Sequence, residues 1–183
     1  MITTEVVAAL ASKYYGINAE VSSLAGELDL NFHLNSVTSS QYILKLHSSS
    51  TDSAVLEMQD SALEFIASNA PSLGTPRIIY TNNNKASVLV DLNGQQYTLR
   101  LLSWLDGDLW SAAKLDDLES FWSLGRYLAR LDNVLGSFKH SAGSREFLWD
   151  MRQSQVHLAW LPAVPAELRE SMTCILNRFE AEI

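Results

Sequence analysis

The sequence predicts an α+β domain: a mostly antiparallel sheet of about five strands with one inserted helix, followed by a helical region. Three observations support this prediction. Residues 28–34 and 42–47 alternate apolar and polar side chains, as half-buried strands do. Residues 53–69 carry apolar side chains at helical spacing. All five tryptophans lie beyond residue 100, where the pattern becomes helical. We place the domain boundary there, which gives residues 1–105 and 106–183.

The first predicted element is a short amphipathic helix. Thr3 or Thr4 is the expected N-cap, Val7 and Leu10 belong to the apolar face, and Gly16 ends the helix.

Two strands follow as an antiparallel hairpin. In the first strand, alternate residues point to one face: Leu28, Leu30, Phe32 and Leu34. The polar stretch "NSVTSSQ" then leads into the strand from Tyr42 to His47.

The inserted helix and the last strands complete the first hundred residues. The apolar stripe predicted for the helix consists of Val55, Met58, Ala62, Phe65 and Ile66. Three β-prone runs follow, at 77–80, at 87–90 and from 95. Asn93-Gly94 predicts a hairpin between the last two.

Helical patterns make up the remainder of the chain. They begin at about Leu115, Ser144 and Pro165, where proline suits a first helical turn. The last pattern is still running at Ile183, so we expect the sequence to be a piece of a longer protein.

Composition excludes several classes of partner. The chain has 47% hydrophobic residues and a net charge of -8, whereas non-specific binding to nucleic acid or to an anionic membrane needs a cationic surface. No apolar stretch approaches the length of a membrane span. Cys174 is the single cysteine, which excludes an internal disulfide and fits a cytoplasmic protein.

Four motifs in this order resemble the aminoglycoside phosphotransferase family, whose fold is protein-kinase-like. The run "LAGELDLNFHL" resembles the nucleotide-covering hairpin, "YILKL" the strand that carries the ATP lysine, and "LRLLSWLDG" the last strand of the small lobe and the hinge. The pair "LGRYLARLD" and "REFLWDMR" is similar to the first large-lobe helices of the hydroxylysine-kinase-like branch. The resemblance covers about residues 18–155. It implies a protein-kinase-like small lobe, helices of an incomplete large lobe, and a kinase that uses ATP and Mg²⁺.

Lys45 is the central candidate for binding the nucleotide. It shares a strand face with Ile43, and a buried ammonium group needs an anionic partner from the protein or from a ligand. We assign that partner to a nucleotide phosphate, with Ile43 above the adenine. Gly26 is the only glycine between residues 17 and 73, and its turn can lay backbone N–H groups over phosphates. The other candidates in this turn are Glu27, Asp29 and Asn31.

In kinases, an acidic residue of the inserted helix pairs with this lysine. Glu57 is the obvious candidate. At about 100° per residue, however, Gln59 lies about 60° from the centre of the apolar stripe and Glu57 about 140° away. We therefore predict that Gln59 orients Lys45. By the same resemblance, the backbone at Ser103, Trp104 and Leu105 would bind the adenine edge.

The catalytic loop of the family is absent from this sequence. That loop carries a His-x-Asp motif with an asparagine five residues after the aspartate, and none of the four histidines here has an aspartate two positions later. We therefore predict no catalytic residue and no metal ligand in these residues, and an inactive fragment. His33 and His47 could form a metal pair on neighbouring strands, but we predict that they lie on a solvated strand face.

The predicted function is the ATP-binding part of a small-molecule kinase. Its acceptor would be a hydroxyl of an amino acid, an amino alcohol or an aminoglycoside-like compound. The alternative is a non-catalytic nucleotide-binding or regulatory kinase-like module of a fusion protein. A third reading is an α+β domain that binds no nucleotide. Fusion to further domains and dimerisation of this piece both remain open at this stage.

Overall fold

The structure is a computed structural model of the chain that describes residues 2–109, 118–145 and 150–182. The chain divides into two compact units, Met1–Ala142 and Gly143–Ile183. The predicted boundary at residues 105 and 106 falls within the first unit. The predicted boundary separates the two lobes of a complete kinase, which differs from a division into compact units, and it stays a prediction.

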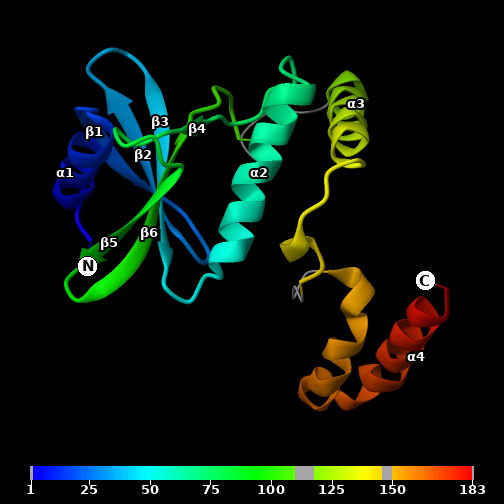
Figure 1. Cartoon of the computed structure of the whole chain (residues 1–183). Helices are drawn as coiled ribbons and strands as arrows, with labels where there is room; N and C mark the ends of the chain where they lie inside the picture. The colour runs from blue at the N-terminus through cyan, green and yellow to red at the C-terminus, as the bar shows by residue number, and fades with distance from the viewer. Residues whose placement is uncertain (1, 110–117, 146–149, 183) are drawn as a thin grey trace. The chain divides into compact units, whose positions relative to one another are not determined.

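An antiparallel sheet forms the centre of the first unit (Figure 1). The strands are β1 (Ala19–Leu24), β2 (Leu30–Ser36), β3 (Gln41–Ser48), β4 (Ile78–Ile79), β5 (Ser87–Leu92) and β6 (Gln95–Ser103). Their order is β1-β2-β3-β6-β4, and β5 also pairs with β6. Six strands are present where about five were predicted. The additional strand is β1, an edge strand with no buried residue, so burial imposes no clear alternation on its sequence.

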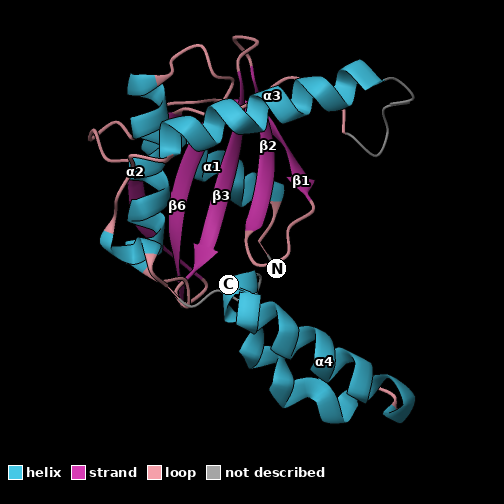
Figure 2. Cartoon of the chain, turned by 90° about the vertical axis from the view of Figure 1, so that its right-hand side faces the viewer, coloured by secondary structure: helices cyan, strands magenta, loops and turns pink. Residues whose placement is uncertain are grey.

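The helix α1 (Thr4–Tyr15) covers one face of the sheet, as Figures 1 and 2 both show. It ends at Gly16, whose φ of 67° lies in the left-handed region that favours glycine. Apolar side chains from α1 and from the central strands fill the space between them. They include Val7, Leu10, Ala11, Phe32, Leu34, Leu44, Leu46, Leu99 and Leu101. Deep burial of alternate strand residues explains why the sequence pattern is so regular there.

The helix α2 (Ser53–Asn69) lies on the opposite side of the sheet (Figures 1 and 2). Its N-cap is Asp52, whose carboxylate accepts a hydrogen bond from the backbone N–H of Ala54 at 2.9 Å. The buried residues of α2 are Leu56 and Ile66. The predicted stripe omits Leu56, so the buried face of the helix is rotated from the predicted one.

The helix α3 (Leu118–Leu135) contacts the segment that follows α2. The Tyr127 hydroxyl donates to the carbonyl oxygen of Gly74 at 3.0 Å, and Arg130 donates to the Ser72 hydroxyl at 3.2 Å. The predicted start of this helix, Leu115, lies outside the described residues.

The second unit is helical. A 3₁₀ helix, η2 (Met151–Ala163), is followed by α4 (Ala166–Glu182), which packs against it. The helical pattern predicted from about Ser144 is therefore 3₁₀-helical from Met151 onward, and residues 144, 145 and 150 are not helical. The start of α4 directly after Pro165 agrees with the prediction. No helix within the described ranges is both long and apolar enough to span a membrane.

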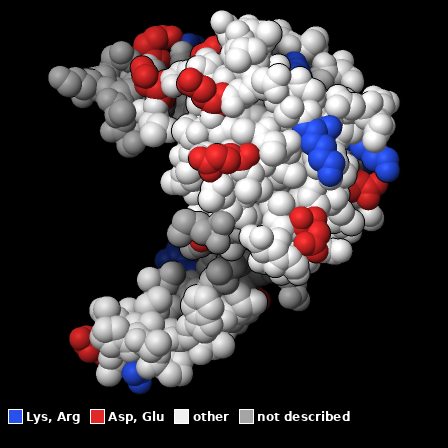
Figure 3. All heavy atoms as spheres, turned by 90° about the vertical axis from the view of Figure 1, so that its left-hand side faces the viewer, with Lys and Arg blue, Asp and Glu red and all other residues white. Residues whose placement is uncertain are grey.

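The charged side chains are scattered on the surface that Figure 3 shows. Lysine and arginine side chains there are few, and acidic ones lie among them. On this face, the described residues form no continuous basic surface of the kind that nucleic acid needs.

Candidate functional site

Two rows of side chains cross the face of the sheet that carries α2. Directly paired residues of antiparallel strands have their side chains on the same face. Asn31 pairs with Lys45, and Lys45 pairs with Arg100, so these three form one row. The next row contains His33, Ile43 and Leu102. Since Leu44 and Leu46 point into the α1 core, Lys45 points to the other side.

The ammonium group of Lys45 has an anionic partner within the protein. Its Nζ lies 3.2 Å from Oδ2 of Asp29, and the two side chains are 25% and 21% exposed. The turn before β2 brings Asp29 back toward β3. This corrects the assignment of the lysine's partner to a ligand phosphate alone. A carboxylate already balances the charge, while a quarter of the Lys45 side chain remains exposed.

The Asp29 carboxylate is also the first member of a chain of polar contacts that runs through His47 to Arg100. Nδ1 of His47 lies 2.8 Å from Oδ1 of Asp29, and Nε2 of His47 lies 3.4 Å from Nη1 of Arg100. Because a guanidinium can only donate, Nε2 is the acceptor and Nδ1 carries the proton that is donated to Asp29. His47 is 1% exposed, so the prediction of a solvated strand face is wrong for this residue. Its burial lowers the pKa of the imidazole, while the nearby Asp29 carboxylate opposes that shift.

Arg100 links this chain to α2. It is 2% exposed, forms a salt bridge with Asp60 and donates to Oε1 of Gln59 at 2.9 Å. Burial raises the pKa of the Asp60 carboxyl, and the Arg100 guanidinium opposes this. The contact found for Gln59 is thus to Arg100 and not to Lys45. This corrects the prediction that the amide orients the lysine. Glu57 is exposed, as its helical position predicts.

The turn between β1 and β2 requires a glycine. A Cβ atom at Gly26 would collide with the carbonyl oxygen of Asp29 and with the side-chain amide of Asn31. Asn31 donates to that same carbonyl at 3.4 Å, while its buried Oδ1 has no hydrogen-bond partner among the described residues. Glu27 is exposed in this turn. The glycine is therefore needed for a close approach within the turn itself.

Two backbone N–H groups of the segment predicted to bind adenine already form hydrogen bonds within the protein. The N–H of Ser103 donates to the carbonyl of Arg77 at 2.8 Å, and the N–H of Trp104 donates to the carbonyl of Gln41 at 3.2 Å. These two N–H groups are thus not free to bind a base. The Trp104 ring lies beside the His33 ring, with centroids 4.3 Å apart, and Leu105 is exposed.

Arg100, His47 and Asp60 are site residues that the sequence reasoning missed. A signal for Arg100 was present, because it stands inside the apolar run "TLRLLSWL". The rule applied to Lys45, that a charge within a strand pattern needs a counter-ion, applies equally there. His47 gives no such signal, because a neutral imidazole at a strand end fits either face.

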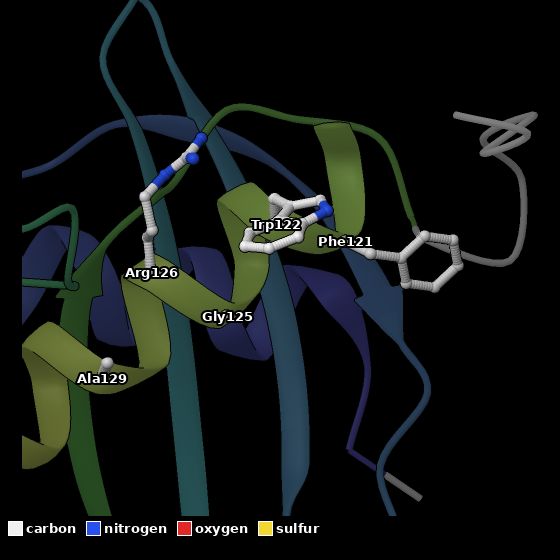
Figure 4. Close-up of a pocket in the computed structure, with 5 residues that line it drawn as sticks. All are labelled: Phe121, Trp122, Gly125, Arg126 and Ala129. Carbon is white, nitrogen blue, oxygen red and sulfur yellow. The ribbon is translucent and has the colours of Figure 1, made fainter. Parts of the chain in front are cut away.

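A separate apolar hollow of about 460 Å³ lies along α3. Figure 4 shows its lining residues, which all come from this one helix: Phe121, Trp122, Gly125, Arg126 and Ala129. It is therefore an exposed helix face rather than an enclosed site.

Comparison with known proteins shows which solved structures have a similar fold. The sequence matches no protein-family model and no curated protein. The structure is similar to an amicoumacin kinase solved in complex with AMP-PNP and Ca²⁺, with a TM-score of 0.70 and 16% identity. That match covers 98% of this chain and 52% of the kinase. A microcompartment-associated aminopropanol kinase matches with a TM-score of 0.63 and 17% identity, over 87% of this chain and 55% of that one.

The chain therefore spans about half the length of the solved kinases it matches. Both the α+β class and the resemblance predicted from the sequence are confirmed at the level of the fold: the chain has a fold similar to that of about half of each of these two solved kinases.

Proposed function

We propose that this chain is the ATP-binding part of a small-molecule kinase. One observation carries the proposal. Lys45 projects from the central strand β3 on the α2 side of the sheet, its side chain is partly exposed, and Asp29 holds its ammonium group beside the Gly26 turn. In kinases, a lysine on the corresponding strand binds the nucleotide phosphates.

The residues around Lys45 fit a nucleotide. An ammonium group has three N–H donors, and Asp29 needs only one of them, which leaves donors for phosphate oxygens. The turn at Gly26, which has no room for a side chain, folds back onto the backbone of Asp29, whose carboxylate holds the lysine. Ile43 and Leu102 of the next row, together with the Trp104 ring beside His33, supply apolar surface for a base. The edge of the base would then form hydrogen bonds with the carbonyl groups of residues 103–105 and with the N–H of Leu105.

Magnesium would enter with the nucleotide, and its role would be to neutralise phosphate charge. The described residues contain no group of three or more acidic, histidine or cysteine side chains that could hold a metal ion. We therefore propose that the metal ligands and the catalytic base lie in a part of the enzyme outside this sequence. The missing His-x-Asp motif supports this view, as does the coverage of about half of each solved kinase.

The proposed acceptor is a hydroxyl group of an amino acid, an amino alcohol or an aminoglycoside-like compound. The names of the two similar kinases, which include an aminopropanol kinase, support this class. We place the enzyme in the cytoplasm, where ATP is available and where a single cysteine is ordinary. A non-catalytic nucleotide-binding module is the second candidate, favoured by the absent catalytic loop.

The first test is nucleotide binding by the protein as its gene encodes it. ATP with Mg²⁺ at tenfold its dissociation constant should raise the free energy of unfolding by about 1.4 kcal/mol. Lys45→Ala should remove most of this stabilisation, whereas Lys85→Ala, at an exposed lysine, should leave it unchanged. Equal stabilisation of the wild type and of the Lys45 variant would contradict the proposal.

The second test measures phosphoryl transfer to a panel of amino alcohols and amino acids. Turnover that depends on Lys45 supports the kinase. Nucleotide binding without turnover on any acceptor supports the non-catalytic module.

A further inference from the structure

We propose that Asp29 is the positioning residue for Lys45 and that His47 and Arg100 hold Asp29 in place. This inference rests on the proposed function and deepens it. In protein kinases, an acidic residue of the inserted helix positions the phosphate-binding lysine directly. Here the acidic residue comes from the turn before β2, and the helix reaches the lysine only through intermediates.

The first step concerns the three acidic residues of α2: Glu57 and Glu64 are exposed, and Asp60 is already engaged elsewhere. Asp60 of α2 forms its salt bridge with Arg100, and Gln59 accepts from the same guanidinium at 2.9 Å. Within the described part of the chain, the ion pair of Lys45 is with Asp29.

The second step is that Asp29 is fixed at both oxygens. Oδ2 lies 3.2 Å from Nζ of Lys45, and Oδ1 lies 2.8 Å from Nδ1 of His47. His47 is almost completely buried, so it gives this carboxylate a rigid support. A carboxylate bound through both oxygens is suited to holding a lysine and poorly suited to swinging away when phosphate arrives.

The third step connects the support to α2. Nε2 of His47 faces Nη1 of Arg100 at 3.4 Å, and the guanidinium is anchored on the helix. The chain thus runs from Asp60 through Arg100, His47 and Asp29 to Lys45. These contacts connect α2 with the ammonium group of Lys45.

The charges support a positioning role. Two carboxylates, Asp29 and Asp60, balance two cations, Lys45 and Arg100, with His47 neutral between them. The charges of the network are therefore balanced before any ligand binds. A phosphate would meet a lysine that is already oriented, and less side-chain entropy would be lost on binding.

The test compares Asp29 with a carboxylate that has no place in the site. Asp29→Asn removes the ion pair with little change in shape, while Glu20→Gln removes an equal charge from an exposed position in the edge strand β1. The dissociation constant of AMP-PNP with Mg²⁺ is measured on the protein as its gene encodes it. We expect Asp29→Asn to weaken binding about three- to tenfold and Glu20→Gln to change it less than twofold. Unchanged or tighter binding by Asp29→Asn would overturn the proposal, because Asp29 would then be a bystander or a competitor of phosphate.

The second test concerns His47. An asparagine at this position can still donate from near the place of Nδ1, whereas a leucine cannot. His47→Leu should weaken nucleotide binding as Asp29→Asn does, and His47→Asn should recover at least half of that loss. Equal losses in the two variants would count against His47 as a support for Asp29.

A measurement on the wild type does not depend on the folding of these variants. The ¹⁵N chemical shifts of the His47 imidazole should show a neutral ring protonated at Nδ1. In a neutral ring protonated at Nε2, Nδ1 could not donate a hydrogen bond to Asp29. That result would refute the proposed support of Asp29 by His47.

The two proposals fail in different ways. If the proposed function is wrong, Lys45→Ala does not weaken nucleotide binding. If only the positioning role is wrong, Lys45→Ala weakens binding while Asp29→Asn does not.

Discussion

Replacing Arg100 by methionine tests the buried polar chain most directly. Methionine keeps the apolar length of the side chain and removes the guanidinium, so Asp60 loses its salt-bridge partner and Gln59 loses a donor. Arg100 is 2% exposed, whereas the Asp60 side chain is 14% exposed. Removing one partner of a fully buried ion pair costs about 3–5 kcal/mol. Since Asp60 keeps some contact with water, we expect a loss of about 2–3 kcal/mol.

Urea unfolding followed by tryptophan fluorescence measures this loss as a lower midpoint with an unchanged slope. The matched control is Arg126→Met. Its ion pair with Glu119 lies at the surface, with side chains 60% and 75% exposed, so its removal should cost less than about 0.5 kcal/mol.

A double variant separates the ion pair from simple packing. In Arg100→Met with Asp60→Leu, no uncompensated charge remains, and an apolar pair can replace a buried ion pair with little loss. We expect the double variant to recover most of the stability lost in Arg100→Met. A cost below about 0.5 kcal/mol for Arg100→Met alone, or no recovery in the double variant, would refute the assignment of Arg100 as a buried, paired charge.

Two further predictions concern the turn and the histidine. Gly26→Ala should destabilise the protein by about 1–3 kcal/mol, because its methyl group would collide with the backbone at Asp29. Gly74→Ala, which meets no atom within 4 Å, is the control in the same urea assay. The free energy of unfolding should also fall as the pH is lowered from 7 to 5. The pKa of His47 lies below its ordinary 6.5 when folded, so the unfolded chain binds the extra proton in this range. The groups that act on this imidazole are Asp29, Arg100 and Lys45. The slope is at most about 1.4 kcal/mol per pH unit for one proton. His47→Asn should flatten it, and an equally steep dependence in that variant would assign it to other groups.

The local signals in the sequence were sufficient for much of the fold. Apolar alternation in β2 and β3 and the Asn93-Gly94 turn between β5 and β6 reflect the burial of one sheet face, and burial constrains each residue separately. The same alternation placed Lys45 on the strand face of Ile43. The edge strand β1 buries no residue completely, so it left no such pattern and was missed.

The partners of the charged residues could not be predicted in the same way. Sequence periodicity gives the face on which a side chain lies, but not which of several charges on that face it meets. Asp29 is 16 positions from Lys45, and Asp60 is 40 positions from Arg100. These pairings depend on how one turn folds back over β3 and on how α2 is rotated against the sheet.

The sequence by itself determined the strand pattern, the inward lysine and the absence of a catalytic-loop motif, because each is a property of neighbouring residues. Only the tertiary structure decided that the lysine is balanced by Asp29 and that Gln59 and Asp60 turn to Arg100. Coulomb and hydrogen-bond energies depend on distances through space, and the register of β3 with β6 and the packing of α2 set those distances.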